Sequence, residues 1–183
     1  MSEHALTLET PSLALLPGYA DALARRWSPN NVRDVSAEQL AALRADAAGF
    51  IASLLAQSGR IRLPDGSEVE KLPSVTRWLW DGEFCGAIGL RWQPGSDRLP
   101  DYVLGHIGFA VVPWKRRRGY ASRALASMLP VARSVGLARV ELTAEPGNAA
   151  SRRVIEKNGG RLVRKLVYPR YGPEPKLLYA IDL

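Results

Sequence analysis

The sequence predicts an α/β protein in which helices flank a mixed central sheet. Short apolar or alternating stretches of strand type recur along the chain, and stretches of helical spacing lie between them. Its 183 residues suffice for one well-buried core and are few for two independent ones. No fixed-period repeat or low-complexity linker divides the chain, so we expect a single domain.

A strand and two helices are expected first. Residues 6–8 have the pattern of a short strand. Residues 12–27 have the apolar spacing of a helix, with Pro17 in its first turn or at a break. Ser36 is expected to cap a clearer helix that continues to residue 54.

Two hairpins are expected in the middle of the chain. The pair Asp65-Gly66 predicts the turn of a small one. Residues 75–80 and 84–92 have strand patterns, and the pair Asp81-Gly82 between them is a strong hairpin signal.

A strand over residues 104–112 opens the second half of the chain, and Pro113 ends it because proline has no N–H for a ladder. The helix that follows has an apolar face. Pro130 is expected to kink this helix or end it early, and Gly136 can terminate it. A strand, a helix and two strands complete the chain, over residues 139–144, 148–158, 162–167 and 176–181.

The chain is strongly basic, with a formal charge of +7 and a pI near 9.9. A basic protein attracts nucleic acids, anionic membranes and polyanionic small molecules alike. Many of the cations gather around one glycine turn, where Trp114 and Tyr120 are the only aromatic residues available for base stacking. A phosphorylated cofactor therefore explains the cluster more economically than nucleic acid does.

Several features favour a cytoplasmic protein. There is no apolar stretch of about 20 residues, so no membrane span is expected. The first residues include an acidic one and no long apolar core, unlike a secretory signal. The single cysteine, Cys85, cannot form an internal disulfide and is expected to be a small core residue on a strand.

The glycine turn has the layout of a phosphate site. Three arginines precede Gly119 and Ala121, which leave little side chain between an anion and the first free N–H groups of the next helix. A phosphate there would meet N–H donors, the positive end of the helix dipole and several cations. The alternative is a solvated basic surface, since basic residues before a helix are common.

Two motifs in this half of the chain resemble those of the GCN5-related N-acetyltransferases. Arg116-x-x-Gly119-x-Ala121 resembles the pyrophosphate loop of that family, R/Q-x-x-G-x-G/A. Asn148-x-x-Ser151 and the later sequence EKNGG resemble its next block, N-x-x-S/A followed by K-x-G.

The two blocks occur in the family's order with a strand between them, and the resemblance is specific over roughly residues 105–167. The chain looks most similar to the uncharacterised "predicted acetyltransferase" branch, which tends to have His at the position of His106. The resemblance implies a mostly antiparallel central sheet flanked by helices, with a cofactor cleft between splayed strands.

The resemblance also implies one acetyltransferase domain over residues 1–183. Acceptor-side helices and a hairpin are expected in residues 1–73, and the acetyl-CoA-binding core in residues 104–167. Pantetheine is expected to pair with strand backbone, and Asn148 can also serve as a helix N-cap. The residues expected to bind acetyl-CoA are Phe109, Ala110, Val111, Arg116, Arg117, Arg118, Gly119, Tyr120, Ala121, Asn148, Ser151 and Lys157.

Amine acetylation needs a neutral amine, a polarised thioester carbonyl and a proton for the leaving thiolate. His106 is a candidate base, because strand alternation places it on one face with Gly108 and Ala110, whose small size leaves room for a thioester arm. Alternatively, a helix residue fills that space and His106 is a hydrogen-bonded core residue. Glu145, at the end of the next strand, is a second candidate base, and N–H groups near Val111 would polarise the carbonyl.

The chain departs from the family at the acid that protonates the thiolate. Many relatives carry Tyr seven residues after the motif's Asn, where this chain has Ile155. Since Ile155 cannot donate a proton, the usual acid is missing or has moved, and Ser151, Tyr168, Tyr171 or water could replace it. The two tyrosines lie in a proline-rich loop, where packing roles are about as frequent as catalytic ones.

The sequence as a whole predicts an N-acetyltransferase that moves acetyl from acetyl-CoA to a primary amine by direct attack in a ternary complex. The acceptor is open between a small molecule and a peptide or protein amine, and a homodimer is compatible with the resemblance. A non-catalytic acyl-CoA-binding sensor is an alternative that Ile155 favours. A nucleic-acid-binding module is a third interpretation and would bind with steep salt dependence. Two His and one Cys offer no metal-ligand spacing, so no metal is expected.

Overall fold

The computed structural model describes residues 5–183, and their contacts form two compact units. The first unit holds the chain up to Ala56 together with Val75–Gly89 and Phe109–Ala124. The second holds Gln57–Ser74, Leu90–Gly108 and Leu125–Leu183. The expectation of a single domain over the whole chain stays a prediction.

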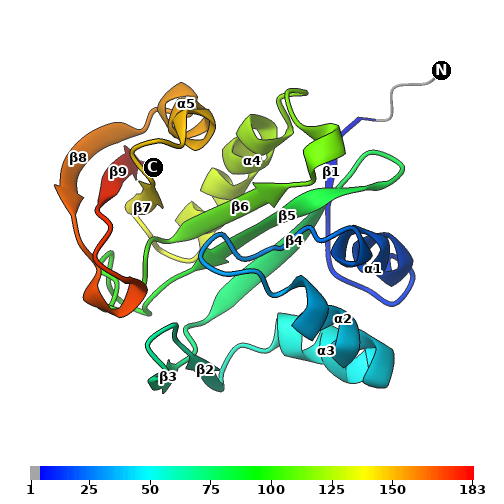
Figure 1. The fold of residues 1–183 in the computed structure, drawn as a ribbon. Helices are drawn as coiled ribbons and strands as arrows, with labels where there is room; N and C mark the ends of the chain where they lie inside the picture. Colours follow the sequence, from blue (N-terminus) through cyan, green and yellow to red (C-terminus); the bar gives the residue numbers. More distant parts are fainter. Residues whose placement is uncertain (1–4) are drawn as a thin grey trace. The chain divides into compact units, whose positions relative to one another are not determined.

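A four-stranded sheet has the order β1-β4-β5-β6. Its strands are β1 (Thr7–Glu9), β4 (Ser74–Trp80), β5 (Phe84–Arg91) and β6 (Ile107–Val111). Figure 1 shows β4, β5 and β6 side by side. The predicted hairpin between β4 and β5 is confirmed, and Gly82 in its turn has a φ of 97°, which glycine adopts without strain. The strand predicted from residue 104 begins only at Ile107.

Three helices belong to the first unit: α1 (Leu16–Ala24), α2 (Ser36–Ala45) and α3 (Ala47–Leu55). The single helix predicted from Ser36 to residue 54 was wrong, because Asp46 takes an extended conformation and its carboxylate accepts the N–H of Gly49 at 2.9 Å, which caps α3. Ser36 is also not the cap of α2. Its own N–H donates to the carboxylate of Asp34 at 2.8 Å.

Aromatic side chains form the centre of the first unit's core. Tyr19 of α1 stacks on Trp78 of β4 with ring centroids 4.7 Å apart, and Trp27 and Phe84 meet Tyr19 edge-on. Offset and edge-to-face pairs add about 0.5–1.5 kcal/mol each beyond the burial of their area. The apolar face of α1 is therefore held against the sheet. Cys85 is fully buried on β5, as predicted.

Helix α4 (Tyr120–Ser134) follows the glycine turn and continues from the first unit into the second. Of the two outcomes expected at Pro130, the early end was wrong, since the helix runs four residues beyond it. The kink stays a prediction. Pro130 is exposed, so water can hydrogen-bond the carbonyl that its missing N–H leaves free. The predicted stop at Gly136 is confirmed: its φ is 91°, and the N–H of Leu137 reaches back to the carbonyl of Ala132.

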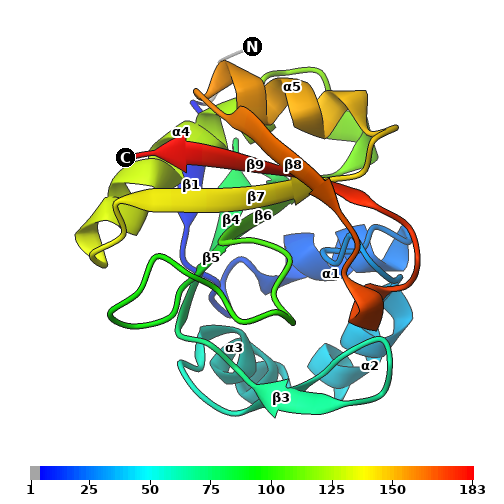
Figure 2. The same ribbon diagram turned by 90° about the vertical axis from the view of Figure 1, so that its left-hand side faces the viewer.

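The second unit contains an antiparallel sheet of order β7-β9-β8. Its strands are β7 (Arg139–Ala144), β8 (Arg161–Leu166) and β9 (Lys176–Asp182). Helix α5 (Ala149–Lys157) contacts β7, and Figure 2 shows β9 between β7 and β8. Tyr179 of β9 fixes α5 through its hydroxyl, which receives a hydrogen bond from Arg152 and donates one to Glu156.

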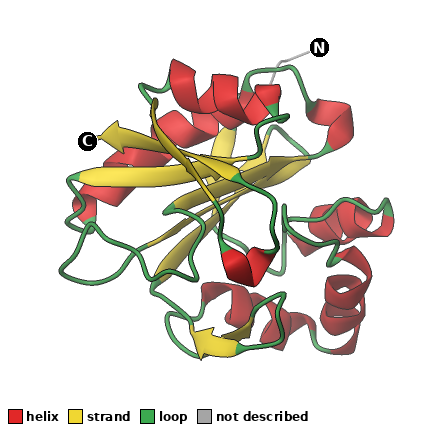
Figure 3. Cartoon of the chain, turned by 60° about the vertical axis from the view of Figure 1, so that its left-hand side comes forward, coloured by secondary structure: helices red, strands yellow, loops and turns green. Residues whose placement is uncertain are grey.

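The remainder of the second unit is a small hairpin and a long loop. The hairpin predicted at Asp65-Gly66 is confirmed as β2 (Arg60–Arg62) and β3 (Glu68–Glu70). Tyr102 in the loop donates its hydroxyl to the Glu70 carbonyl. The strands (yellow) and helices (red) of Figure 3 confirm the predicted α/β class with mostly antiparallel pairing. Among residues 5–183, none of the helices is long and apolar enough to cross a membrane.

Candidate functional site

The glycine turn of the first unit presents a row of free backbone donors. The short 3-10 helix η1 (Pro113–Lys115) leads into it, and Arg117 and Gly119 both have positive φ, 62° and 74°. Within the described residues, the N–H groups of 117–121 have no hydrogen-bond acceptor. The three arginines 116–118 are exposed beside them. Free N–H groups at the start of a helix, with cations around them, are suited to bind phosphate.

An internal ion pair anchors this turn. Asp81, from the β4–β5 hairpin, accepts hydrogen bonds from Lys115 Nζ at 2.9 Å and from the hydroxyl of Tyr120. The Asp81 and Lys115 side chains are only 6% and 11% exposed. Burial raises the pKa of Asp81, but the hydrogen bonds from Tyr120 and Lys115 outweigh it and bring the pKa down to about 2. The Tyr120 side chain therefore holds the turn in place, while its backbone N–H stays available.

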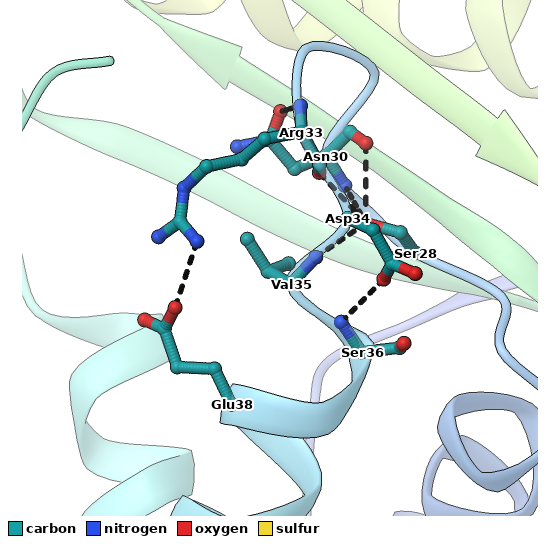
Figure 4. A network of polar contacts seen from close by, with 7 residues as sticks. All are labelled: Ser28, Asn30, Arg33, Asp34, Val35, Ser36 and Glu38. Carbon is teal, nitrogen blue, oxygen red and sulfur yellow. Dashed lines mark hydrogen bonds and ion pairs between the residues drawn. The ribbon is translucent and has the colours of Figure 1, made fainter. Parts of the chain in front are cut away.

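Asn31, in the loop between α1 and α2, bonds to the backbone of the strand segment that is predicted to pair with pantetheine. Its Nδ2 donates to the carbonyl of Phe109 on β6 at 3.1 Å. The loop around it is held by short-range contacts. Asn30 Oδ1 accepts the N–H groups of Val32 and Arg33. Figure 4 shows Arg33 paired with Glu38 of α2. The Phe109 carbonyl is thus satisfied by a side chain that sequence reasoning did not single out.

Helix α5 of the second unit carries the other predicted cofactor residues. Asn148 is its N-cap, with Oδ1 accepting the N–H of Ser151 at 3.0 Å. Lys157 is exposed in the last turn, and Ile155, which stands where many relatives have Tyr, is 1% exposed. Glu145 precedes the helix, exposed, with Oε1 3.6 Å from Lys176 Nζ.

His106 is fully enclosed in the second unit. Its N–H donates to the Glu141 carbonyl at 2.7 Å, and its Nδ1 accepts the Glu141 N–H at 2.9 Å. In a neutral imidazole this bond places the ring proton on Nε2, which is buried with no partner among residues 5–183. Burial lowers the pKa of His106 to about 4 and outweighs the opposing effect of Asp97.

The two bonds between His106 and Glu141 join segments that belong to two different sheets. His106 immediately precedes β6, and Glu141 belongs to β7, yet β6 and β7 belong to different sheets. The imidazole therefore replaces a backbone partner for Glu141 at this point. His106 as the base stays a prediction, and its burial and its Nε2 proton count against direct contact with an amine in this conformation.

Tyr168 lines a cavity of about 340 Å³ within the second unit, together with Glu141, Arg164 and Arg170. Burial, and then the charge of Glu141, raise the pKa of Tyr168, so its hydroxyl keeps its proton. The neighbouring Tyr171 instead uses its hydroxyl structurally, donating to the Tyr102 carbonyl at 2.7 Å. Tyr168, one of the two tyrosines considered as acids, thus lines this cavity.

The predicted site residues divide between the units. The turn residues 116–121 and the strand residues 109–111 lie in the first. His106, Glu145, Asn148, Ser151, Lys157 and Tyr168 lie in the second. Sequence reasoning missed Asp81 and Asn31, because a hairpin aspartate and a loop asparagine have ordinary structural roles in most chains, and only the fold brings them to Tyr120 and Phe109.

The fold and the glycine turn together define a class of protein. The profile of the Acetyltransferase (GNAT) domain matches residues 6–161, most of the chain. The chain therefore belongs to the GNAT acetyltransferases, as its motifs predict. No curated protein sequence is similar enough to this chain to count as a relative.

Solved structures of low sequence identity share the fold. RimL, the ribosomal L7/L12 α-N-protein acetyltransferase in complex with coenzyme A, has a TM-score of 0.65 at 13% identity, covering 100% of this chain and 96% of its own. The microcin C7 self-immunity acetyltransferase MccE, in complex with acetyl-CoA and AMP, has a TM-score of 0.64 at 10% identity, covering 100% and 94%. RimJ of Mycobacterium smegmatis, in complex with CoA-disulfide, has a TM-score of 0.62 at 22% identity, covering 97% and 81%.

Proposed function

We propose that this protein is an N-acetyltransferase that moves an acetyl group from acetyl-CoA to a primary amine by direct attack in a ternary complex. The observation that carries the proposal is the row of unpaired N–H groups over residues 117–121, held by the Asp81 anchor and surrounded by exposed arginines. Most of this turn is exposed, so its N–H groups are open to an anion, and free N–H groups at a helix start favour binding of one. Membership of the GNAT family supports the pyrophosphate of acetyl-CoA as that anion.

The turn residues Arg116 to Ala121 are proposed to bind the pyrophosphate of acetyl-CoA, with Asn148, Ser151 and Lys157 as further binding residues. The backbone of Phe109, Ala110 and Val111 is proposed to pair with pantetheine. Pairing at the Phe109 carbonyl would compete with the side chain of Asn31, so Asn31 is expected to move when cofactor binds. Bound acetyl-CoA supplies an acyl group that is activated as a thioester.

Proton transfer from the amine is proposed to involve Glu145 or His106. Glu145 is exposed and ionisable, and can accept a proton directly or through water. His106 would first have to open its surroundings, since Nε2 is buried and carries the ring proton. We propose Tyr168 or Ser151 as the acid that protonates the leaving thiolate, because this chain has Ile155 where many relatives have Tyr.

The acceptor is proposed to be a small-molecule amine or a peptide or protein amine. RimL, which acetylates the α-amine of a ribosomal protein, supports the second class, whereas MccE is described with AMP. We further propose that the protein is cytoplasmic, that it forms a single domain and that it can form a homodimer.

Thiol release tests it. The protein is incubated with acetyl-CoA and a panel of primary amines, and free CoA is measured with and without each amine. Amine-dependent release supports the enzyme. Tight acetyl-CoA binding with no release for any amine would instead support a non-catalytic acyl-CoA sensor, the function that Ile155 favours.

A further inference from the structure

The cavity that Tyr168 lines belongs wholly to the second unit, and Tyr168 is its only lining residue with a role in the proposed function. The lining comes from the loop 99–103, from β7, β8 and β9, and from residues 167–170 after β8. Its volume of about 340 Å³ is at the small end for ligand pockets, which span about 300–1,000 Å³. The cavity therefore suits a molecule of amino-acid size.

One face of the β7-β9-β8 sheet forms the floor of this cavity. Glu141 of β7 lies opposite Ala180 of β9. Arg164 of β8 lies opposite Leu178, two residues from Ala180. Residues that lie opposite each other, or two apart on a strand, project from the same face. Glu141, Leu178 and Arg164 therefore share a face, and β9 separates the two charged strands by two strand spacings, about 10 Å (Figure 2).

The two charges on this face do not neutralise each other. The Glu141 carboxylate and the Arg164 guanidinium have no hydrogen bond or ion pair within residues 5–183. Arg170, which also lines the cavity, is already engaged, because its Nη1 donates to Ser67 Oγ at 3.1 Å. Burial raises the pKa of Tyr168, Glu141 adds to the rise and Arg164 opposes it. A free carboxylate and a free guanidinium thus both act on the Tyr168 hydroxyl.

Opposite charges on either side of an apolar floor match a ligand that carries both charges itself. The lining holds two carboxylates and two guanidinium groups, from Asp101, Glu141, Arg164 and Arg170. It therefore has no net charge to attract a polyanion or a polycation. A carboxylate and an ammonium can each form charge-assisted hydrogen bonds with the group of opposite sign. One free guanidinium balances a carboxylate, but not the charge of about −2 that a phosphate carries.

We propose that this cavity binds the acceptor, and that the acceptor is a free amino acid with an apolar side chain, its amine at Glu141 and its carboxylate at Arg164. This inference rests on the proposed function, because it treats the ligand of the cavity as the acceptor. Tyr168, proposed as the acid, lines the cavity, and Glu141 is hydrogen-bonded through its backbone to His106, a candidate base. A protein N-terminus has an amide in place of the carboxylate, so it leaves Arg164 without its partner.

The first experiment measures binding without turnover by isothermal titration calorimetry. Leucine, valine and phenylalanine are each compared with the amide, which lacks the carboxylate, and with the matching carboxylic acid, which lacks the amine. The parent is expected to bind at least one of these amino acids about 10-fold tighter than either analogue. This is the low end of the range for hydrogen bonds to charged groups, because Arg164 is exposed.

Two variants assign the two charges. Arg164→Gln should lower the affinity for the amino acid to that for its amide, and should melt at the parent temperature because the Arg164 side chain has no partner to lose. Glu141→Gln should remove the advantage over the carboxylic acid, while its backbone can still bond to His106. The controls are Lys165→Gln, beside Arg164, and Glu174→Gln, in the loop between β8 and β9; both residues are exposed and outside the lining, so parental affinities are expected.

Thiol release separates this inference from the proposed function. With acetyl-CoA, the parent should favour the amino acid over its amide by about 10-fold in kcat/KM, and Arg164→Gln should remove that preference. Release that is as fast with the amide, together with equal affinities or no binding in calorimetry, overturns the inference and leaves the acetyltransferase in place. Charge-dependent binding that Arg164→Gln removes, without thiol release for any amine, supports the cavity ligand and contradicts the enzyme. An equal loss of affinity in Lys165→Gln overturns the site, because the preference then reports only the general charge of β8.

Discussion

The Asp81 anchor of the glycine turn yields a stability prediction that can be worked from the structure. Asp81→Asn keeps an oxygen that can accept the Tyr120 hydroxyl, but it removes the negative charge beside Lys115. The pKa of Asp81 falls from its ordinary value of 3.8 to about 2 in the fold. A lowering of this size corresponds to about 2 kcal/mol of stability at neutral pH. For a chain of this length, that is about 4–8 °C in melting temperature.

The pH dependence has a definite sign. Because the pKa is lower in the folded state, the stabilisation is fully present above pH 4 and is lost as the pH falls from about 4 to about 2. The melting temperatures of parent and Asp81→Asn should therefore differ at pH 7 and converge near pH 2. Asp21→Asn is the matched control, since its pair with Arg25 is more than half exposed and should contribute under about 1 kcal/mol.

Thermal denaturation across this pH range, followed by circular dichroism, measures both variants. Acetyl-CoA should also stabilise Asp81→Asn less than the parent, because the turn loses its anchor. A parent–mutant difference that is absent at pH 7, or that is equal at pH 7 and below pH 3, would refute the reasoning.

Three further predictions concern the proposed site. Gly119→Glu should abolish stabilisation by acetyl-CoA in a thermal-shift titration, since it places bulk and negative charge at the N–H row; equal stabilisation in mutant and parent would remove the phosphate assignment. Neutralising arginines 116–118 should weaken CoA binding, measured by calorimetry, much more than binding of a pantetheine fragment without phosphates, and less so at high salt; equal losses for both ligands would indicate a folding defect. If His106 is the base, His106→Ala should slow acetylation by about 10²- to 10⁴-fold with acetyl-CoA affinity nearly unchanged, and less at high pH. His106→Asn is its control, because Asn can still accept the Glu141 N–H. The parent should lose stability as the pH falls from about 6.5 to about 4, where protonation opposes the buried, neutral imidazole, and His106→Asn should lose less. A parent-like rate and pH profile in both His106 variants would show that His106 is a structural core residue and not the base.

Local chemistry explains which elements were predictable. The turn at Asp81-Gly82 and the cap at Asn148 depend on residues adjacent in sequence, and both occur as predicted. The break at Asp46 was missed because an Asp between apolar residues of helical spacing looks like an exposed helix residue. Only its hydrogen bond from the Gly49 N–H shows that it caps a new helix. The early helix end at Pro130 did not occur, since an exposed interior proline is tolerated when water replaces the lost hydrogen bond.

The candidate site was predictable where motifs are contiguous and not where partners are distant. The glycine turn could be identified from one short segment, whereas its anchor Asp81 lies over 30 residues earlier in the chain. The environment of His106 could not be read from strand alternation, because its pKa and tautomer depend on Glu141, a residue of another strand.

Transfer of an isotopically labelled acetyl group tests the central claim most directly. Acetyl-CoA with a labelled acetyl carbon is incubated with the protein and an amine identified by thiol release, and the products are followed by NMR, with Gly119→Glu as control. The account predicts label in an amide bond on the acceptor nitrogen, in equal amount to the free CoA, for the parent and not for Gly119→Glu. Label that stays on CoA, or that appears only as free acetate, would contradict it.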